Sequence, residues 1–472
     1  MKAWERERKI TDQAMPKVLT EEEQTWDLAF VLEENEDRHT KVLWKSNVPG
    51  SFAPESIMTA AVQSKENMGF IVERAEELLD EGLKALADND MVALHKVTSK
   101  LWRQINEAKI DEESNYRTYK NYTSWEAYEK AVEFPDARQY NNDKNHMMDA
   151  LRAGWISQII GGAMGTAIEG YTTENIRKIF GEVRDYVRKP NTFNDDITYE
   201  LAFLKAYAEN GKAITSEDIA LEWIGLIPSG WSAEEIALRN IRYGIFPPES
   251  GTTGNPFSDW IGAQMRGAVC GMVAPGDPKE AARLAWLDGS VSHSNNGIIG
   301  EIFNALLVSL SFVETDIKEI LDKTLKMIPK DSEYYEVVDF AYKKCKETDN
   351  WESAWKHCEK RLEKYNWIHA YPNAAAEVIA LWYGKGDFDE TIHIIAMTGQ
   401  DVDCNAAQIM NVIGVMIGVE GIPKRWKDPI GDDLDTYVRT MKKMTISGLT
   451  EWTYKSIRQH SELSDTFKGY IR

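Results

Sequence analysis

The stretch Thr398-Gly399-Gln400-Asp401-Val402-Asp403-Cys404-Asn405-Ala406-Ala407 places two carboxylates between two apolar segments. Residues 392–397 before it are almost all apolar, and an apolar helix is expected after it as far as Val419. Acidic side chains this close in apolar surroundings repel one another and are costly to bury unless a cation joins them. The stretch therefore indicates a candidate divalent-metal site between two apolar segments, and these residues alone are equally compatible with the absence of such a site.

A second acidic pair, Asn194-Asp195-Asp196, stands at the start of another predicted helix. Apolar residues follow it at steps of three and four, and Asn210-Gly211 closes the pattern: Ile197, Leu201, Leu204 and Ala208. Taken alone, the pair is typical of an N-terminal helix cap. Brought together with the first stretch, it would form an oxygen-rich site suited to Mg²⁺ or Mn²⁺.

Two further polar residues are candidates because of the glycines around them. Glu169 ends the glycine-rich run of residues 161–168, so its carboxylate could approach a ligand, although a helix-terminal surface glutamate is the simpler interpretation. His293 lies in the polar loop of residues 288–297, before an apolar helix expected over residues 302–312. A helix-capping or buried structural histidine explains it equally well. The sequence contains no Ser-His-Asp elbow, Walker loop or dinucleotide fingerprint.

Helical periodicity extends over most of the chain. One stripe is formed by Val72, Ala75, Leu79, Leu83 and Leu86. After the turn at residues 88–90, a second stripe is formed by Met91, Leu94, Val97, Leu101 and Ile105. These stripes predict a helical hairpin. Because alternating strand patterns of useful length are nearly absent, we expect a mainly α-helical protein.

The amino-acid composition of the chain changes near residue 145. The first 140 or so residues are highly charged and poor in glycine, the polar stretch 136–143 follows, and glycine clusters recur beyond Asp149. We therefore expect an N-terminal helical extension over residues 1–145 and a second part over residues 146–472. The extension also contains large apolar side chains that a free-standing hairpin could not cover, so we expect it to dock on the second part or on a second copy: Trp4, Trp26, Trp44, Trp102 and Trp125.

The composition excludes several classes of function. Among 472 residues, 76 acidic and 55 basic side chains give a net charge of −21, which repels nucleic-acid backbones and anionic lipid surfaces. The longest apolar candidates, residues 302–313 and 409–419, are shorter than the roughly 20 residues needed to span a bilayer. The N-terminus lacks the apolar core of a signal peptide, and four cysteines are scattered without CxxC spacing. We expect a cytoplasmic protein, for which a homo-oligomer is compatible with the sequence.

Taken together and in this order, the segments resemble the ADP-ribosylglycohydrolase family. That family includes the bacterial enzyme that reactivates dinitrogenase reductase and the animal ADP-ribosyl-acceptor hydrolases. Residues 161–169 resemble its G-x-x-x-G-x-x-x-E opening, and residues 194–196 stand where the family has Thr-Asp-Asp. Ser292-His293 with Gly297 matches S-H-x-x-x-G, and residues 401–407 match D-x-D-[TC]-N-[GA]-A. The resemblance covers roughly Leu151 to Gly421 and is strongest to a longer bacterial branch.

The resemblance implies an all-α orthogonal helical bundle with two divalent cations, Mg²⁺ or Mn²⁺. It implies hydrolysis of an N- or O-glycosidic bond at the anomeric carbon of an ADP-ribosyl group on a small molecule or a protein. By position, it implies these metal ligands: Asn194, Asp195, Asp196, Asp401, Asp403 and Cys404. It assigns catalysis to Glu169 and Asp196, and substrate contacts to Ser292, His293, Asn296, Gly297 and Gly399.

Two residues depart from the family pattern. Asn194 replaces a threonine but keeps a hard, neutral oxygen, whereas Cys404 replaces a threonine hydroxyl with a soft thiol that is poorly matched to Mg²⁺. Two other functions stay open at this stage: an N-ribosyl hydrolase of free nucleosides or small glycosides, and a non-catalytic ADP-ribose-binding protein. The presence of Glu169 and all four aspartates argues against the second.

Overall fold

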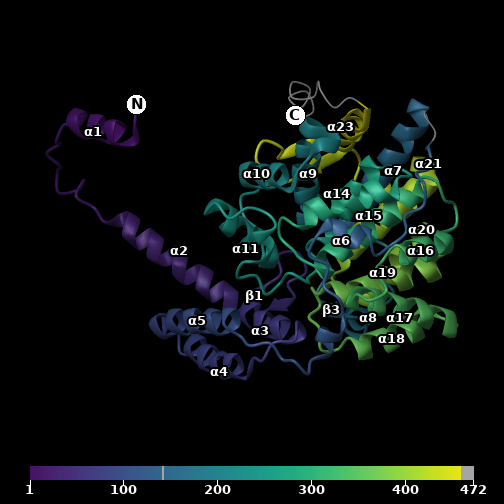
Figure 1. The fold of residues 1–472 in the computed structure, drawn as a ribbon, viewed down its shortest axis with the longest axis horizontal. Coiled ribbons are helices and arrows are strands. Elements are labelled where there is room, and N and C mark those ends of the chain that lie inside the picture. The colour runs from purple at the N-terminus through teal and green to yellow at the C-terminus, as the bar shows by residue number, and fades with distance from the viewer. Residues whose placement is uncertain (141–142, 459–472) are drawn as a thin grey trace.

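The computed structural model describes residues 1–140 and 143–458, which fold almost entirely into α-helices (Figure 1). The expectation of an all-α protein is confirmed. The strands in these ranges form three short antiparallel pairs: β1 Ser46–Asn47 with β2 Pro54–Glu55, β3 Tyr171–Thr172 with β4 Gly399–Gln400, and β5 Asp433–Asp435 with β6 Lys443–Thr445.

The N-terminal part begins with an arm that leaves the body of the molecule (Figure 1). Its helices are α1 Ala3–Gln13, α2 Asp27–Trp44, α3 Ile57–Asn67, α4 Glu73–Ala87, α5 Met91–Asn106, the 3₁₀ helix η1 Asn115–Thr118 and α6 Trp125–Glu129. Helix α1 has no buried residue, and α2 buries only Thr40 and Trp44 near its end. Trp4 and Trp26 are 66% and 80% exposed, so the body does not cover these two of the five tryptophans, and their docking on a second copy stays a prediction.

Helices α4 and α5 form the predicted hairpin, but α4 is rotated from its predicted face. In α5 the stripe of Leu94, Val97, Leu101 and Ile105 is buried as expected. In α4 the predicted stripe is buried in part. Ala75 is buried and Leu79 and Leu86 pack against the core, whereas Leu83 is exposed and the face shifts to bury Leu78, Gly82 and Ala85. The cause is the indole of Trp44, which lies where a Cβ on Gly82 would be. The aromatic side chain from α2 therefore selects the face that α4 buries.

From Trp44 onward, the N-terminal part packs on the rest of the chain within one apolar core. The Ser64 hydroxyl donates to the Pro256 carbonyl (2.7 Å), and the Tyr128 hydroxyl donates to the Met327 carbonyl (2.7 Å). The division at residue 145 itself stays a prediction. Of the polar stretch predicted to end the extension, residues 141 and 142 lie outside the described residues.

The remaining helices surround a central pair. They are α7 Lys144–Gly165, α8 Thr173–Phe180, α9 Asp195–Asn210, η2 Gly211–Ala213, α10 Ser216–Leu226, α11 Ser232–Arg242, α12 Glu249–Thr252, η3 Gln264–Arg266, α13 Gly267–Val273, α14 Pro278–Gly289, α15 Asn296–Ser311, α16 Ile317–Lys326, α17 Glu333–Glu347, α18 Trp351–Arg361, α19 Ala370–Gly384, α20 Phe388–Thr398, α21 Val402–Gly421, α22 Lys424–Lys427 and α23 Ile446–Arg458. The central pair is α7 and α21, both of which are mostly buried.

Glycines of α7 let its backbone touch the backbone of α21. A Cβ on Gly161 would lie 2.4 Å from the Ala406 carbonyl oxygen, and one on Gly165 would lie 2.2 Å from the Asp403 nitrogen. Real Cβ atoms do not approach that closely, so the G-x-x-x-G spacing fixes this contact. It sets the start of α21, with its two aspartates, beside the end of α7.

One described helix, α21, is long and apolar enough to cross a membrane by length and composition. The sequence expectation that no apolar segment reaches this length is therefore wrong for residues 402–421. Most of α21 is buried between other helices, as in the core helix of a globular protein.

Candidate functional site

The two acidic segments lie against each other at the start of α9 and the start of α21. The side-chain amide of Asn194 donates from Nδ2 to Asp403 Oδ2 (3.2 Å), and the Cys404 thiol donates to Asp196 Oδ1 (3.1 Å). One ligand atom from each of Asp401, Asp403 and Cys404 lies within 4.8 Å of the others, so these three residues could hold a metal ion. We call Asp195, Asp196, Asp401 and Asp403 the acidic cluster.

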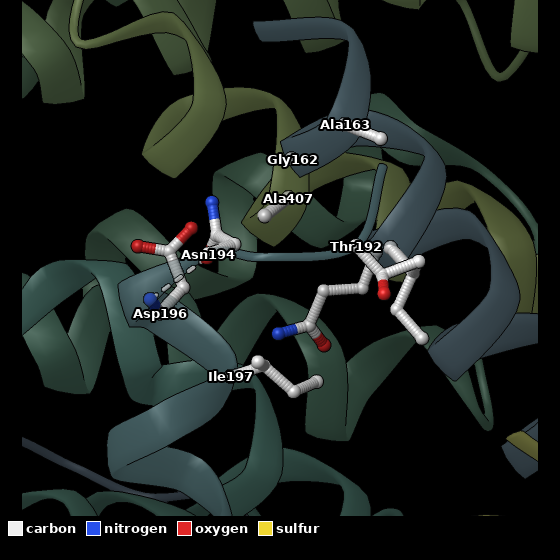
Figure 2. A pocket seen from close by; sticks show the side chains of 9 residues that line it. Gly162, Ala163, Thr192, Asn194, Asp196, Ile197 and Ala407 are labelled. Atoms are coloured by element: carbon white, nitrogen blue, oxygen red, sulfur yellow. Dashed lines mark hydrogen bonds between the residues drawn. The ribbon is translucent and has the colours of Figure 1, made fainter. Parts of the chain in front are cut away.

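Asn194 is both a helix cap and a neighbour of the acidic cluster. Its Oδ1 accepts a hydrogen bond from the Asp196 nitrogen (2.8 Å), as the cap interpretation of the sequence proposed. Its Nδ2 therefore faces Asp403, and the oxygen assigned to a metal by the resemblance is engaged in the cap. Figure 2 shows Asn194 and Asp196 on one side of a small pocket, with Gly162 and Ala407 among the residues that line it.

Asn373 of α19 orients the start of α21. Its Oδ1 accepts hydrogen bonds from the Asp401 nitrogen (3.0 Å) and from Asn405 Nδ2 (2.7 Å). Its own Nδ2 donates to the Trp367 and His369 carbonyls. The sequence analysis assigned Asn373 no role, although a fully buried amide among alanines is a signal that such hydrogen bonds exist.

The acidic cluster holds more negative charge than its surroundings neutralise. Burial, and then the charge of Asp403, raise the pKa of Asp195 to about 6 and the pKa of Asp196 well above its usual range. The same two causes raise the pKa of Asp401, and burial raises that of Asp403. Two buried oxygens, Asp196 Oδ2 and Asp401 Oδ1, accept no hydrogen bond from the described residues. Unpartnered, hard oxygens in a buried site fit a divalent cation.

Glu169 and Cys404 complete the surroundings of the acidic cluster. Glu169 lies just beyond the end of α7, is buried, and shares a hydrogen bond with Asp403. Burial and the charges of Asp403 and Asp401 raise its pKa well above the usual range. Burial and the neighbouring carboxylates also raise the pKa of the Cys404 thiol, so the sulfur is protonated and a poor ligand for Mg²⁺.

The His293 loop lies in a buried ionic network beside the acidic cluster, because Glu234 of this network interacts with both Arg266 and Asp195. His293 Nδ1 is 2.7 Å from the Ser292 hydroxyl, which accepts a hydrogen bond from Arg266 Nη2 (2.9 Å). Arg266 also pairs with Asp288 and, at 3.2 Å, with Glu234. Burial and the Arg266 charge lower the pKa of His293 and keep it neutral. Within the described residues, no hydrogen bond joins Ser292 or His293 to the acidic cluster. The buried His293 Nε2 has no hydrogen-bond partner among them, so the assignment of these two residues to a substrate stays a prediction.

The other three residues assigned to the substrate contact protein groups. Asn296 is buried at the start of α15 and accepts a hydrogen bond from the Tyr334 nitrogen (3.4 Å). A Cβ on Gly297 would lie 2.2 Å from the Ser258 carbonyl oxygen, and one on Gly399 would lie 2.1 Å from the Tyr171 carbonyl oxygen. These glycines therefore permit close backbone packing. Their roles toward a substrate stay predictions.

A helical bundle that gathers four aspartates at the starts of α9 and α21, with Glu169 just beyond α7, defines a candidate hydrolase centre. The chain belongs to the ADP-ribosylglycohydrolase family, whose model matches residues 143–461. The resemblance drawn from the four motifs is thereby confirmed, and the matched segment excludes nearly all of the N-terminal part.

Similar proteins include one curated relative and one solved structure. An uncharacterized protein of Archaeoglobus fulgidus is 26% identical over 303 residues, which cover 61% of this chain and 93% of the relative. A solved structure described as an ADP-ribosylglycohydrolase-related protein complex is 18% identical with a TM-score of 0.48, and the match covers 67% of this chain and all of that one.

Several polar residues near the acidic cluster carry no motif and were missed by the sequence analysis. Glu234 is buried between Arg266 and the cluster, and burial raises its pKa to about 7 while Arg266 opposes the shift. Tyr437 lies near Asp195, whose charge, after burial, raises the pKa of the phenol. The loop of residues 48–53, from the N-terminal part, runs beside Thr166 and Glu169. Such residues come together only through the tertiary fold.

Proposed function

We propose that the protein is a metal-dependent hydrolase that cleaves the glycosidic bond at the anomeric carbon of an ADP-ribosyl or related ribosyl group. Membership of the ADP-ribosylglycohydrolase family supports a glycohydrolase activity. Metal dependence is supported by the acidic cluster, in which two buried carboxylate oxygens have no hydrogen-bond partner among the described residues.

Two divalent cations, Mg²⁺ or Mn²⁺, would be held by Asp195, Asp196, Asp401 and Asp403. When bound, such ions supply positive charge that orients ribose hydroxyls and a water molecule. The neutral Cys404 thiol and the Nδ2 group of Asn194 suit hydrogen bonds to neighbouring carboxylates better than direct ligation. This assignment leaves four aspartates as the ligands contributed by the chain.

Glu169 is proposed to accept the proton of the attacking water. Its pKa is raised by burial and by Asp403 and Asp401, so it ionises once ligation has neutralised those two carboxylates. A carboxylate with a raised pKa is well matched to proton transfer near neutral pH. The negative charge of the Asp196 carboxylate would stabilise the positive charge that develops at the anomeric carbon.

The proposal is tested with a panel of ADP-ribosylated proteins, ADP-ribosylated small molecules and free nucleosides, each with Mg²⁺, Mn²⁺ or a chelator. The expected result is metal-dependent release of ADP-ribose, which Asp401→Asn abolishes. If only free nucleosides are cleaved, the substrate class is that of a nucleoside hydrolase and not of an ADP-ribosyl hydrolase. If no substrate in the panel is cleaved in a metal-dependent way, the proposal is overturned. A cytoplasmic location stays part of the proposal, on the basis of the scattered cysteines.

A further inference from the structure

A loop of the N-terminal part, residues 48–53, lies beside Glu169. A Cβ on Gly50 would lie 2.3 Å from Thr166 Cγ2 and 3.4 Å from Glu169 Oε1. The loop therefore runs beside the proposed proton acceptor, close enough that a methyl group added at Gly50 would contact it. Residues 48–53 precede the segment matched to the family model. The loop beside Glu169 is therefore contributed by the N-terminal part and not by the matched segment.

Two side chains of the body hold the loop in place. Arg188 donates from Nη1 to the Gly50 carbonyl and from Nη2 to the Thr166 carbonyl. The Tyr171 hydroxyl donates to the Ser51 carbonyl (3.1 Å). The loop is thus tied to both sides of the segment that carries Glu169.

The held loop presents a large aromatic side chain to solvent. Phe52 is 75% exposed and has a φ of 66°, a conformation that favours glycine. A hydrogen bond from its nitrogen to the Val48 carbonyl (2.9 Å) and one from Val48 to the Ala53 carbonyl (2.9 Å) maintain that conformation. Strained residues of this kind are concentrated at ligand-binding sites.

Arg188 provides positive charge beside an acidic site. Its side chain is exposed, and the only acceptors that it reaches among the described residues are the two carbonyls that hold the loop. A guanidinium has five N–H donors, so several stay free for an anion. In a chain with a net charge of −21, a cation at this position is selective for an anionic ligand group.

We propose that Arg188 and Phe52 form a subsite for the nucleoside diphosphate part of the substrate, with Arg188 on the diphosphate and the Phe52 ring stacked on the base. This subsite rests on the proposed function, because it needs a substrate that enters beside Glu169. It assigns the N-terminal part a direct contribution to substrate selection.

The test is calorimetric binding of ADP-ribose and of ribose 5-phosphate to the full-length protein with Mg²⁺. Phe52→Gly suits the positive φ, so it removes the ring without disturbing the loop. It is expected to weaken ADP-ribose binding about tenfold, as the loss of one stacked base does, and to leave ribose 5-phosphate binding unchanged. Phe52→Trp should retain the affinity, and Arg188→Gln should weaken ADP-ribose binding. Phe180→Ala, an exposed ring on α8, is the matched control.

The outcomes separate the subsite from the function. If the wild-type protein does not bind ADP-ribose, the proposed function fails and the subsite fails with it. If the wild type binds ADP-ribose and Phe52→Gly and Arg188→Gln bind it equally well, only the subsite is overturned. An equal loss of affinity for ADP-ribose and for ribose 5-phosphate in Phe52→Gly would also overturn the subsite. That result would mean that Phe52 maintains the structure of the loop and does not contact the base.

Discussion

At the scale of single residues, the acidic cluster combines burial with like charge. Asp195, Asp196, Asp401 and Asp403 lie where desolvation and mutual repulsion both disfavour ionisation. Four carboxylates buried this close together cost free energy of folding unless a cation balances their charge. Glu169 differs from these four, because it lies between the cluster and the N-terminal loop that runs beside it. Its position suits proton transfer better than ligation.

Glu169→Gln tests that difference. The amide keeps the shape of the side chain but cannot accept a proton, so hydrolysis should fall by ~10²- to 10⁴-fold while Mn²⁺ affinity changes little. Steady-state kinetics and a Mn²⁺ titration measure the two quantities. Full activity in the variant would assign the proton acceptor to another acid, and a matching loss of Mn²⁺ binding would make Glu169 a ligand.

The sequence predicted the members of the acidic cluster because short motifs surround them, and it did not predict their neighbours. Asp401 and Asp403 stand out as acids inside an apolar stretch, whereas Asn373 and Arg188 look ordinary in their own segments. Their importance comes from contacts across long sequence separations, such as the hydrogen bond from Asp401 to Asn373. The sequence also assigned His293 to the substrate, and that assignment stays a prediction: Nδ1 contacts the Ser292 hydroxyl, whereas the buried Nε2 has no hydrogen-bond partner among the described residues.

At the scale of elements, helix packing positions the chemistry. Gly161 and Gly165 allow α7 to meet α21 backbone to backbone, which brings Glu169 and the two aspartates of α21 together. The sequence shows these glycines but not the helix that they approach. It could not predict the rotated face of α4, because that face depends on Trp44 reaching Gly82 from another helix.

Gly165→Ala should destabilise the fold by about 1–3 kcal/mol, because the added methyl group meets the backbone of Asp403 and cannot move a side chain out of its way. Chemical denaturation measures the free energy of unfolding. Gly225→Ala is the matched control, since a methyl group at that position would meet no atom within 4 Å and α10 should gain slightly in stability. Equal effects of the two substitutions would contradict the backbone contact between α7 and α21.

A buried carboxyl also joins α19 to its neighbours and predicts a pH dependence. Glu377 Oε1 accepts hydrogen bonds from Gln264 (3.1 Å) and Asn304 (3.2 Å), and burial raises its pKa to about 8. In the unfolded chain the group loses its proton near pH 4.5, so this residue lowers stability as the pH rises from about 4.5 to about 8.

Glu377→Gln keeps the accepting oxygen and cannot ionise. The variant should match the wild type in free energy of unfolding near pH 4.5 and exceed it, by on the order of a few kcal/mol, at pH 8. Denaturation at several pH values provides the comparison. A difference between the two proteins that does not change with pH would contradict the raised pKa.

At the scale of the whole molecule, the N-terminal part divides into an arm and a docked region. Helix α1 and the first half of α2 bury nothing, whereas the residues from Trp44 onward share the core of the body. Composition alone could not separate the two, because both are charged, helical in pattern and rich in tryptophan. The two regions differ in whether their apolar side chains pack against the body, which depends on the tertiary fold.

Two deletions should therefore behave differently. Removal of residues 1–36 takes away no buried apolar contact, so the melting temperature should stay close to that of the full chain. Removal of residues 1–145 exposes the surface under α3 to α6 and should give an aggregating protein, as size-exclusion chromatography would show. A soluble, monomeric and fully active protein lacking residues 1–145 would prove that the extension is a detachable module.

The central claim is that the acidic cluster is a binuclear metal centre, and anomalous X-ray scattering at the manganese edge tests it most directly. Crystals grown with saturating Mn²⁺ should show two peaks among Asp195, Asp196, Asp401 and Asp403, and Asp401→Asn should lose at least one of them. Peaks found only elsewhere on the molecule, or no peak within the cluster at saturating Mn²⁺, would contradict the account.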